Sequence, residues 1–100
     1  MAPVRPLTLR FTESARANLE GILAYISERN PDVAVHIGAR IRLAAELVST
    51  FPDAGRPGKV IGTREWVVRG LPYIIVYEVV DDTVLAILGV FHGAQGRSLG

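Results

Sequence analysis

The sequence contains no cysteine, which excludes disulfide bonds and zinc sites built from thiolates. Histidine is scarce as well: His36 and His92 are the only two, and neither has carboxylates at metal-ligand spacing. We therefore expect no metal site and no cofactor. The lack of cysteine is also compatible with the reducing cytoplasm, but it does not by itself establish that location.

Long apolar runs are missing too. The N-terminal stretch MAPVRPLTLRF has no uninterrupted apolar run of signal-peptide length. No later run approaches the ~20 residues that are needed to cross a bilayer. We expect a cytoplasmic protein with no membrane partner.

Charge of one sign is not in excess, because the formal net charge is +1. This balance argues neither for nor against a nucleic-acid partner, and we expect no direct sequence-specific binding of nucleic acid. One hundred residues suit one domain over 1–100, which would bury roughly 60–65% of the unfolded surface. Within it, residues 1–6 and 96–100 are expected to be flexible tails.

What the sequence does contain is strong helical patterning in its first half. Residues 7–11 alternate apolar and polar side chains, which predicts a half-buried strand. Thr12 then provides the N-cap of an amphipathic helix that reaches about Arg29. Asn30 caps a second helix that ends near Thr50. The short connection makes the two helices an antiparallel hairpin.

The second half is typical of β-structure. Residues 51–62 hold turn chemistry rather than a regular element. Strands are predicted at 64–69, 73–80 and 83–91, and their turns are short enough to require a three-stranded antiparallel meander. The Val and Ile content of the middle strand indicates that both of its faces are substantially covered. The fold class is therefore α+β: an N-terminal strand, an antiparallel helical hairpin and the meander, with the helices on one sheet face.

Few residues could serve a nuclease, which needs an acid, a base and cations around the scissile phosphate. The candidates are Lys59, Arg64, Arg69, Tyr73, Tyr77 and His92. The alternative for each is structural, because tyrosines can close a sheet core and arginines can solvate its open face. Trp66 is either part of the core or an anchor for a partner. Strand alternation places it on one face with Arg64 and Val68, and the sequence leaves open which face the helices cover.

The order of elements and several sequence words in the second half resemble the RelE/ParE toxin superfamily of bacterial toxin–antitoxin modules. The words are GRPG at 55–58, GTRE at 62–65, VRGLPYIIVY at 68–77 and ILGVFHGAQ at 87–95. The GTRE element, the P-Y-x-x-x-Y strand and the HGAQ ending are similar to the ParE branch in particular. The resemblance covers nearly the whole chain, from residue 7 to residue 95, and implies a RelE/ParE-like fold.

The resemblance also implies that nuclease chemistry is absent and that there are no catalytic residues. The mRNA-cleaving relatives carry cations at the positions of Glu65, Val67 and Ile74. They also have a basic tail that contains a tyrosine, which residues 96–100 lack. What the resemblance implies instead is ParE-type activity, in which a toxin inhibits DNA gyrase by binding to it.

Two alternatives stay open. One is a RelE-like, ribosome-dependent mRNA endoribonuclease that uses Arg64, Arg69 and Tyr73 in a different arrangement. The other is a degenerate family member without toxicity. Activity assays on gyrase and on translated mRNA would separate these possibilities.

The resemblance further implies a ParD-like antitoxin partner in a toxin–antitoxin hetero-oligomer. It would bind as a helix in the groove of the helical hairpin and then as an extended stretch along the sheet. We assign this contact to Leu23, Ile26, Ile37, Ile41, Tyr73 and Tyr77. For DNA gyrase we assign residues that combine charge, one aromatic anchor and a shared end of the sheet: Arg56, Arg64, Trp66, Arg69, His92 and Gln95.

Overall fold

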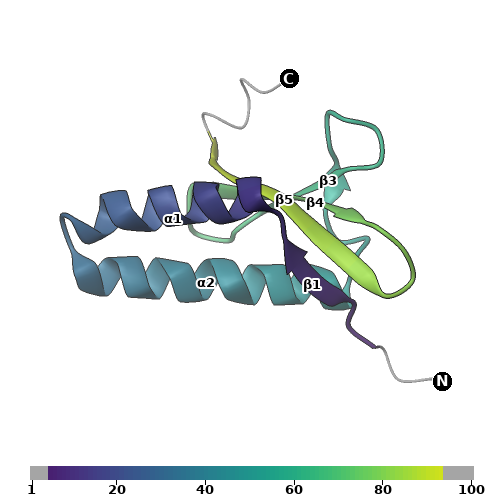
Figure 1. Cartoon of the computed structure of the whole chain (residues 1–100), viewed down its shortest axis with the longest axis horizontal. Helices are drawn as coiled ribbons and strands as arrows, with labels where there is room; N and C mark the ends of the chain where they lie inside the picture. The colour runs from purple at the N-terminus through teal and green to yellow at the C-terminus, as the bar shows by residue number, and fades with distance from the viewer. Residues whose placement is uncertain (1–4, 94–100) are drawn as a thin grey trace.

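The structure, a computed structural model, describes residues 5–93 (Figure 1). Gln95 and the expected tail at 96–100 lie outside these residues, as does most of the expected N-terminal tail. The elements are β1 (Thr8–Phe11), α1 (Glu13–Ser27), α2 (Pro31–Thr50), β2 (Arg56–Pro57), β3 (Arg64–Val67), β4 (Tyr73–Val79) and β5 (Val84–His92). No helix among residues 5–93 is long and apolar enough to cross a membrane.

The helical hairpin forms as predicted, because both of its starts are encoded locally. The Thr12 side chain accepts a hydrogen bond from the Ala15 amide at 3.1 Å, and Asn30 Oδ1 accepts one from the Val33 amide at 3.2 Å. These caps satisfy amides that the first turn of each helix leaves free. The helices run antiparallel, side by side (Figure 1). Helix α1 ends at Ser27, close to the expected limit.

The sheet is larger than the predicted meander. Strands β3, β4 and β5 do form an antiparallel meander, but they belong to a five-stranded mixed sheet in the order β1-β5-β4-β3-β2. Strand β1 runs parallel to β5, since the helical hairpin brings the chain back across the sheet. Strand β2 pairs with β3 inside the segment that was predicted to be turns only. It has two residues, too few to show an alternating pattern.

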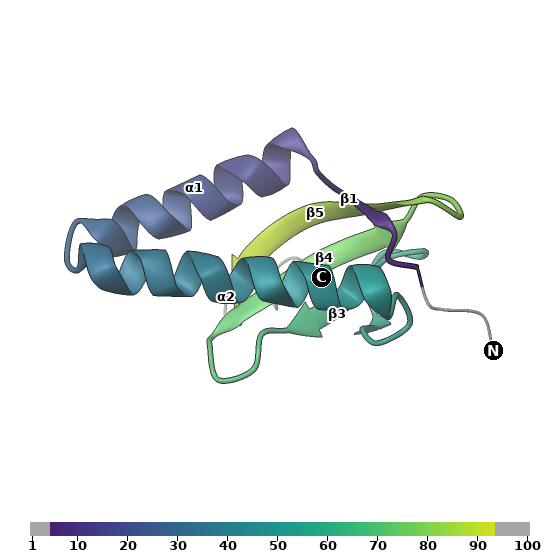
Figure 2. The same cartoon turned by 90° about the horizontal axis from the view of Figure 1, so that it is seen from below.

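One face of the sheet carries the core, and both helices pack against that face (Figure 2). The core side chains of the sheet alternate along their strands, as a half-covered sheet requires. They include Ile75, Tyr77, Leu85, Ile87 and Val90, which meet Ile41, Ala45 and Val48 from α2. Trp66 is partly buried against the same cluster. The open question about Trp66 is thereby settled in favour of the helix-covered face.

Helix α1 also covers the edge of β5 beyond the last pair with β1. The amide of Thr12 donates to the carbonyl oxygen of Ile87 at 3.1 Å, and the Val90 amide donates to Asn18 Oδ1 at 3.3 Å. An irregularity between β4 and β5 shifts the register at the same level, so that Val76 pairs with Gly89 but Tyr77 pairs with Ile87. Leu88 is the extra residue, as in a β-bulge.

Candidate partner-binding surfaces

A buried hydrogen-bond network around Tyr77 holds the loop that follows α2. The Tyr77 hydroxyl donates to the carbonyl oxygen of Pro52 at 2.7 Å and accepts from the Gly55 amide at 2.9 Å. A Cβ on Gly55 would lie 2.6 Å from the hydroxyl oxygen, so only glycine fits. Burial raises the pKa of the Tyr77 hydroxyl, against the opposing effects of the Gly55 amide and Arg64. Tyr77 therefore fastens this loop to the sheet.

Two of the arginines assigned to gyrase, Arg64 and Arg56, are paired inside the chain. Arg64 donates through Nη1 to the carbonyl oxygen of Gly55 at 2.8 Å, and its Nη2 lies 3.5 Å from Asp53 Oδ1. Arg56 donates to Glu65 Oε1 through Nε at 3.2 Å and Nη2 at 3.0 Å. Both guanidinium groups thus bind protein acceptors. The surface of β2 and β3 has less free positive charge than the sequence suggested.

The residues assigned to gyrase do not share one end of the sheet, and that expectation is wrong. Arg64 of β3 lies opposite Tyr77 of β4 in the sheet register. His92 of β5 lies opposite Tyr73, at the other end of β4. Four residues of extended strand separate these two levels, which is about 13 Å. Arg69 lies beyond the end of β3, toward the level of His92. Trp66 is half-buried between them, and Gln95 lies outside the described residues.

His92 and Arg69 are the assigned residues at the second end of the sheet. The ring of His92 meets that of Tyr73 edge-on, with 5.8 Å between centroids and 88° between planes. The Arg69 carbonyl oxygen accepts a hydrogen bond from Arg40 of α2, which ties this turn to the helix. His92 and Arg69 are both exposed. Arg56 is the third exposed residue of the gyrase assignment, at the other end of the sheet.

The residues assigned to the antitoxin fall into two groups. Leu23, Ile26 and Ile37 are half-buried along the helical hairpin and present some apolar surface. Ile41 and Tyr77 are fully buried, and Tyr73 is nearly so. A partner could touch this second group only if the core opened, so in the described conformation they act as core residues. The pattern of apolar spacing does not separate the two groups, because it marks the core-facing side of each helix.

Sequence reasoning missed an apolar ridge on the outer side of α2. It consists of exposed residues at a spacing of four: Val35, Ala39, Leu43, Leu47 and Phe51. Val35 is 75% exposed and Leu43 is 61% exposed. Side chains four apart on a helix are neighbours, so the ridge is continuous along the helix. The repeat of apolar residues every four positions was the signal that could have revealed it.

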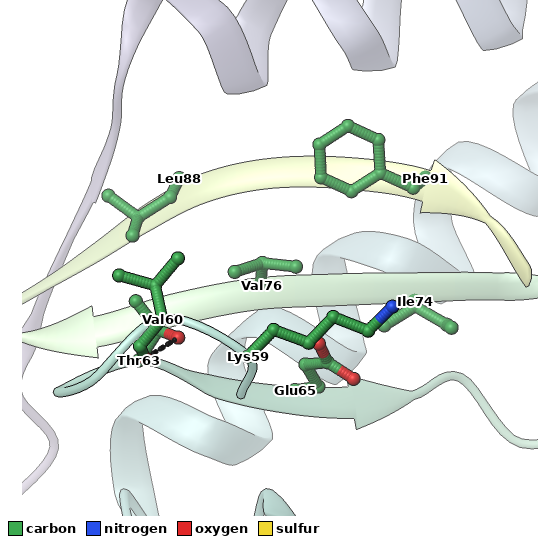
Figure 3. A pocket seen from close by; sticks show the side chains of 8 residues that line it. All are labelled: Lys59, Val60, Thr63, Glu65, Ile74, Val76, Leu88 and Phe91. Carbon is green, nitrogen blue, oxygen red and sulfur yellow. Dashed lines mark hydrogen bonds between the residues drawn. The ribbon is translucent and has the colours of Figure 1, made fainter. Parts of the chain in front are cut away.

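The other missed surface is the sheet face opposite the helices. The interpretation that both faces of the middle strand are substantially covered is confirmed, since Ile74 on this face is only 8% exposed and Val76 is half-buried. The helices pack on the other face only, and a cavity lies on this one. This open-face cavity measures about 270 Å³. Its lining residues are Lys59, Val60, Thr63, Glu65, Ile74, Val76, Leu88 and Phe91, from the β2–β3 loop, β3, β4 and β5 (Figure 3). The register shift at Leu88 brings this side chain into the cavity wall.

The described residues do not assemble a nuclease or metal site. Among residues 5–93 no group of three or more histidine and acidic side chains could hold a metal ion. Arg64 is hydrogen-bonded within the loop after α2, while Tyr73 and Arg69 belong to the other end of the sheet. Glu65 lines the open-face cavity, and its carboxylate is paired with Arg56.

Comparisons with known proteins agree with this architecture. The family model described as the ParE toxin of the type II toxin–antitoxin system parDE matches residues 9–96. Y4kP of Sinorhizobium fredii (strain NBRC 101917 / NGR234), named as a toxin, is 40% identical over 87 residues, which cover 87% of this chain and 88% of the relative.

Two solved structures share the fold. The chromosomal ParDE toxin–antitoxin system of P. aeruginosa superposes with a TM-score of 0.77 at 22% identity, covering 86% of this chain and 95% of that one. The RelBE2 toxin–antitoxin complex of Mycobacterium tuberculosis superposes with a TM-score of 0.58 at 28% identity, covering 88% of this chain and 99% of that one.

Proposed function

This chain belongs to the ParE toxin family of type II toxin–antitoxin systems, and from that membership we propose that it inhibits DNA gyrase by binding. It performs no catalysis of its own, and a ParD-like antitoxin neutralises it. The observation that carries the choice of binding over catalysis is the pairing of Arg64 with Gly55 and Asp53. A guanidinium held in this way is not free to stabilise a transition state at a phosphate.

The positions of the other nuclease candidates support the same choice. An endonuclease must bring its acid, base and cations within hydrogen-bond reach of one phosphate. Arg64 lies at the level of Tyr77, about 13 Å of strand away from the level of Tyr73 and His92. Arg64 is therefore held at a different level of the sheet from Tyr73 and His92 in the described conformation.

The proposal is tested by adding the purified chain to gyrase supercoiling and cleavage assays, and in parallel to a translation reaction whose mRNA is mapped for cuts. We expect supercoiling to be inhibited and the mRNA to stay intact. Codons cut in the ribosomal A site would contradict the proposal in favour of the endoribonuclease. No effect in either assay would identify a degenerate member.

The antitoxin contact is proposed to include the ridge on α2. The ridge from Val35 to Phe51, the C-cap of α2, spans seventeen residues, or about 24 Å along the helix. An amphipathic helix with apolar residues at matching intervals can lie along such a surface. The half-buried Leu23, Ile26 and Ile37 extend the available apolar surface along the hairpin. The toxin–antitoxin complexes among the structural neighbours support a partner of this kind.

The ridge is tested with Leu43→Asp, measured by calorimetric titration with the antitoxin encoded beside this gene. Burying an unpaired carboxylate in an apolar contact should weaken binding by at least about tenfold. Arg42→Asp is the matched control, because Arg42 is exposed on the same helix but lies outside the ridge. Equal affinities of the two variants would exclude the ridge from the antitoxin interface.

A further inference from the structure

The β2–β3 loop presents the most exposed apolar side chain of the described residues. Ile61 is 100% exposed and its neighbour Val60 is 67% exposed. A fully exposed isoleucine makes no contribution to the core of the free chain. Adjacent exposed apolar residues mark a surface that another molecule covers.

Hydrogen bonds fix the shape of this loop. The Gly58 amide donates to the carbonyl oxygen of Thr63 at 2.8 Å. The amide and hydroxyl of Thr63 both donate to the carbonyl oxygen of Val60, at 3.0 Å and 2.6 Å. Gly62 has a φ of 88°, which glycine adopts without strain. Ile61 therefore stands on a braced turn, so little backbone entropy is lost when it is bound.

The open-face cavity begins at Val60, the residue before Ile61 in the chain. Val60 forms one of its walls, and Ile74, Val76, Leu88 and Phe91 form the rest of its apolar lining (Figure 3). An apolar cavity of about 150 Å³ already holds benzene. At about 270 Å³ the open-face cavity has room for an isoleucine side chain. One surface thus carries an apolar projection and, next to it, an apolar cavity of suitable size.

We propose that two copies of this chain form a two-fold dimer through this surface, in which Ile61 of each copy enters the open-face cavity of the other. A two-fold axis can pass between Ile61 and the open-face cavity. It then brings Ile61 of each copy to the cavity of the other copy, so the same surface is used twice in one contact. A partner of another sequence would need a separate projection and cavity in the same arrangement. The second copy already has both.

The charges at this surface do not oppose such a dimer. Glu65, which lines the cavity, is already paired with Arg56 of its own chain at 3.0 Å. Two identical faces therefore approach without bringing an isolated carboxylate of one against that of the other. The helices lie on the opposite face of the sheet (Figure 2), so the ridge on α2 stays accessible. The contact is small, and we expect a dimer with micromolar affinity, on the order of other small transient interfaces.

The test is sedimentation equilibrium of the purified full chain between about 1 and 300 µM, a range that brackets micromolar association. We expect a monomer–dimer equilibrium for the wild type and a monomer for Ile61→Asp at every concentration. Ile61 is fully exposed, so this variant should fold with an unchanged melting temperature. Val35→Asp on α2 is the matched control, since it adds the same charge to an exposed apolar site on the other face, and it should still dimerise.

A second variant tests the cavity rather than the projection. Val76→Phe places a larger side chain in the cavity wall, and it should also be monomeric because the cavity is then filled. A monomeric wild type at all concentrations would overturn the proposal. So would a dimer that persists in Ile61→Asp. If the wild type is monomeric and Ile61→Asp instead weakens antitoxin binding, the surface belongs to the antitoxin and the proposal is likewise rejected.

Discussion

Ile75 and Val76 are neighbours in β4 and are nearly the same in shape and polarity, yet they lie in opposite environments. Ile75 has no exposed surface and packs in the helix-covered core, whereas Val76 lines the open-face cavity. Tyr77 packs in the core on the same face as Ile75, and Ile74 lines the cavity on the same face as Val76. The comparison teaches that the apolar residues of this strand divide into a set that packs against the helices and a set that lines the open-face cavity.

This division explains why the strand reads as continuously apolar. In most antiparallel sheets the solvent-facing side chains are polar. Here the second face keeps valine and isoleucine although no helix covers it. An apolar surface of this kind has no benefit for a permanently isolated chain. Its retention is what a protein that functions through complexes requires.

The largest expected effect separates the two faces directly. Ile75→Ala should lower the free energy of unfolding by about 2–5 kcal/mol, because it removes packed atoms and leaves a cavity in the core. Val76→Ala should cost less than about 1 kcal/mol, since its side chain is only half-buried and no helix packs on it. Urea denaturation of both variants gives the comparison. Equal losses would show that the open face also holds the fold.

A smaller effect is expected from the hydroxyl groups of the two tyrosines in β4. Tyr77→Phe removes the partner of the Gly55 amide and of the Pro52 carbonyl oxygen. Leaving buried polar groups unpaired should cost about 1–3 kcal/mol. Tyr73→Phe is the matched control, because the Tyr73 ring packs edge-on against His92 and this contact does not involve the hydroxyl. We expect the free energy of unfolding of the control to lie within about 0.5 kcal/mol of the wild-type value.

The same pair of variants has a pH signature. The raised pKa means that the folded chain keeps the Tyr77 proton to higher pH than the unfolded chain does. The stabilisation is therefore fully present below pH 10.0 and is lost as pH rises through the folded pKa. The difference in stability between wild type and Tyr77→Phe should shrink in alkaline solution. A constant difference would contradict the assigned environment.

The smallest expected effect concerns the turn that sets the register of β4 and β5, and hence which side chains face the helices. The backbone amide and hydroxyl of Thr83, together with the Val84 amide, donate to Asp81 Oδ1 at 2.7, 2.8 and 3.0 Å. The backbone hydrogen bond from Thr83 is the main reason that the pKa of Asp81 lies below its ordinary value. The folded chain therefore stabilises the charged form of the Asp81 carboxylate.

A lowered pKa in the folded chain means that this stabilisation is present above pH 3.8 and is lost as pH falls through the folded pKa. Asp81→Asn should melt slightly below the wild type at neutral pH, and the two melting temperatures should converge in acid. Asp82→Asn is the control, since it removes a neighbouring carboxylate that accepts none of these hydrogen bonds. If the melting temperatures of both variants converge with that of the wild type in the same way, the pH dependence comes from the loss of one negative charge and not from the hydrogen bonds of the turn.

The helices could be predicted from the sequence because their information is local. Thr12 and Asn30 each cap the helix that follows, and both caps are present. The sheet was only partly predictable, since the pairing of β1 with β5 joins residues at opposite ends of the chain. No period or cap in the sequence records such a contact. The strands were recognisable individually, but their neighbours were not.

The candidate site was harder to predict for the same reason. Arginines at 56 and 64 indicated a basic patch, but the sequence does not show that Glu65 and Gly55 accept their hydrogen bonds. Strict alternation would place Leu88 on the same face as Val90, but the register shift places it in the wall of the open-face cavity. Each error arose where a loop or an irregular strand decides the direction of a side chain. Alternation and periodicity describe regular elements only.

The parallel pairing of β1 with β5 has a consequence for the moment at which this protein becomes active. Thr8 lies opposite Val84, and Phe11 lies opposite Ile87. A ribosome releases the first strand well before it has made its neighbour, so the growing polypeptide cannot close its sheet until β5 has emerged. We expect the nascent molecule to be harmless until that point, and an antitoxin made earlier to meet it as soon as it can fold.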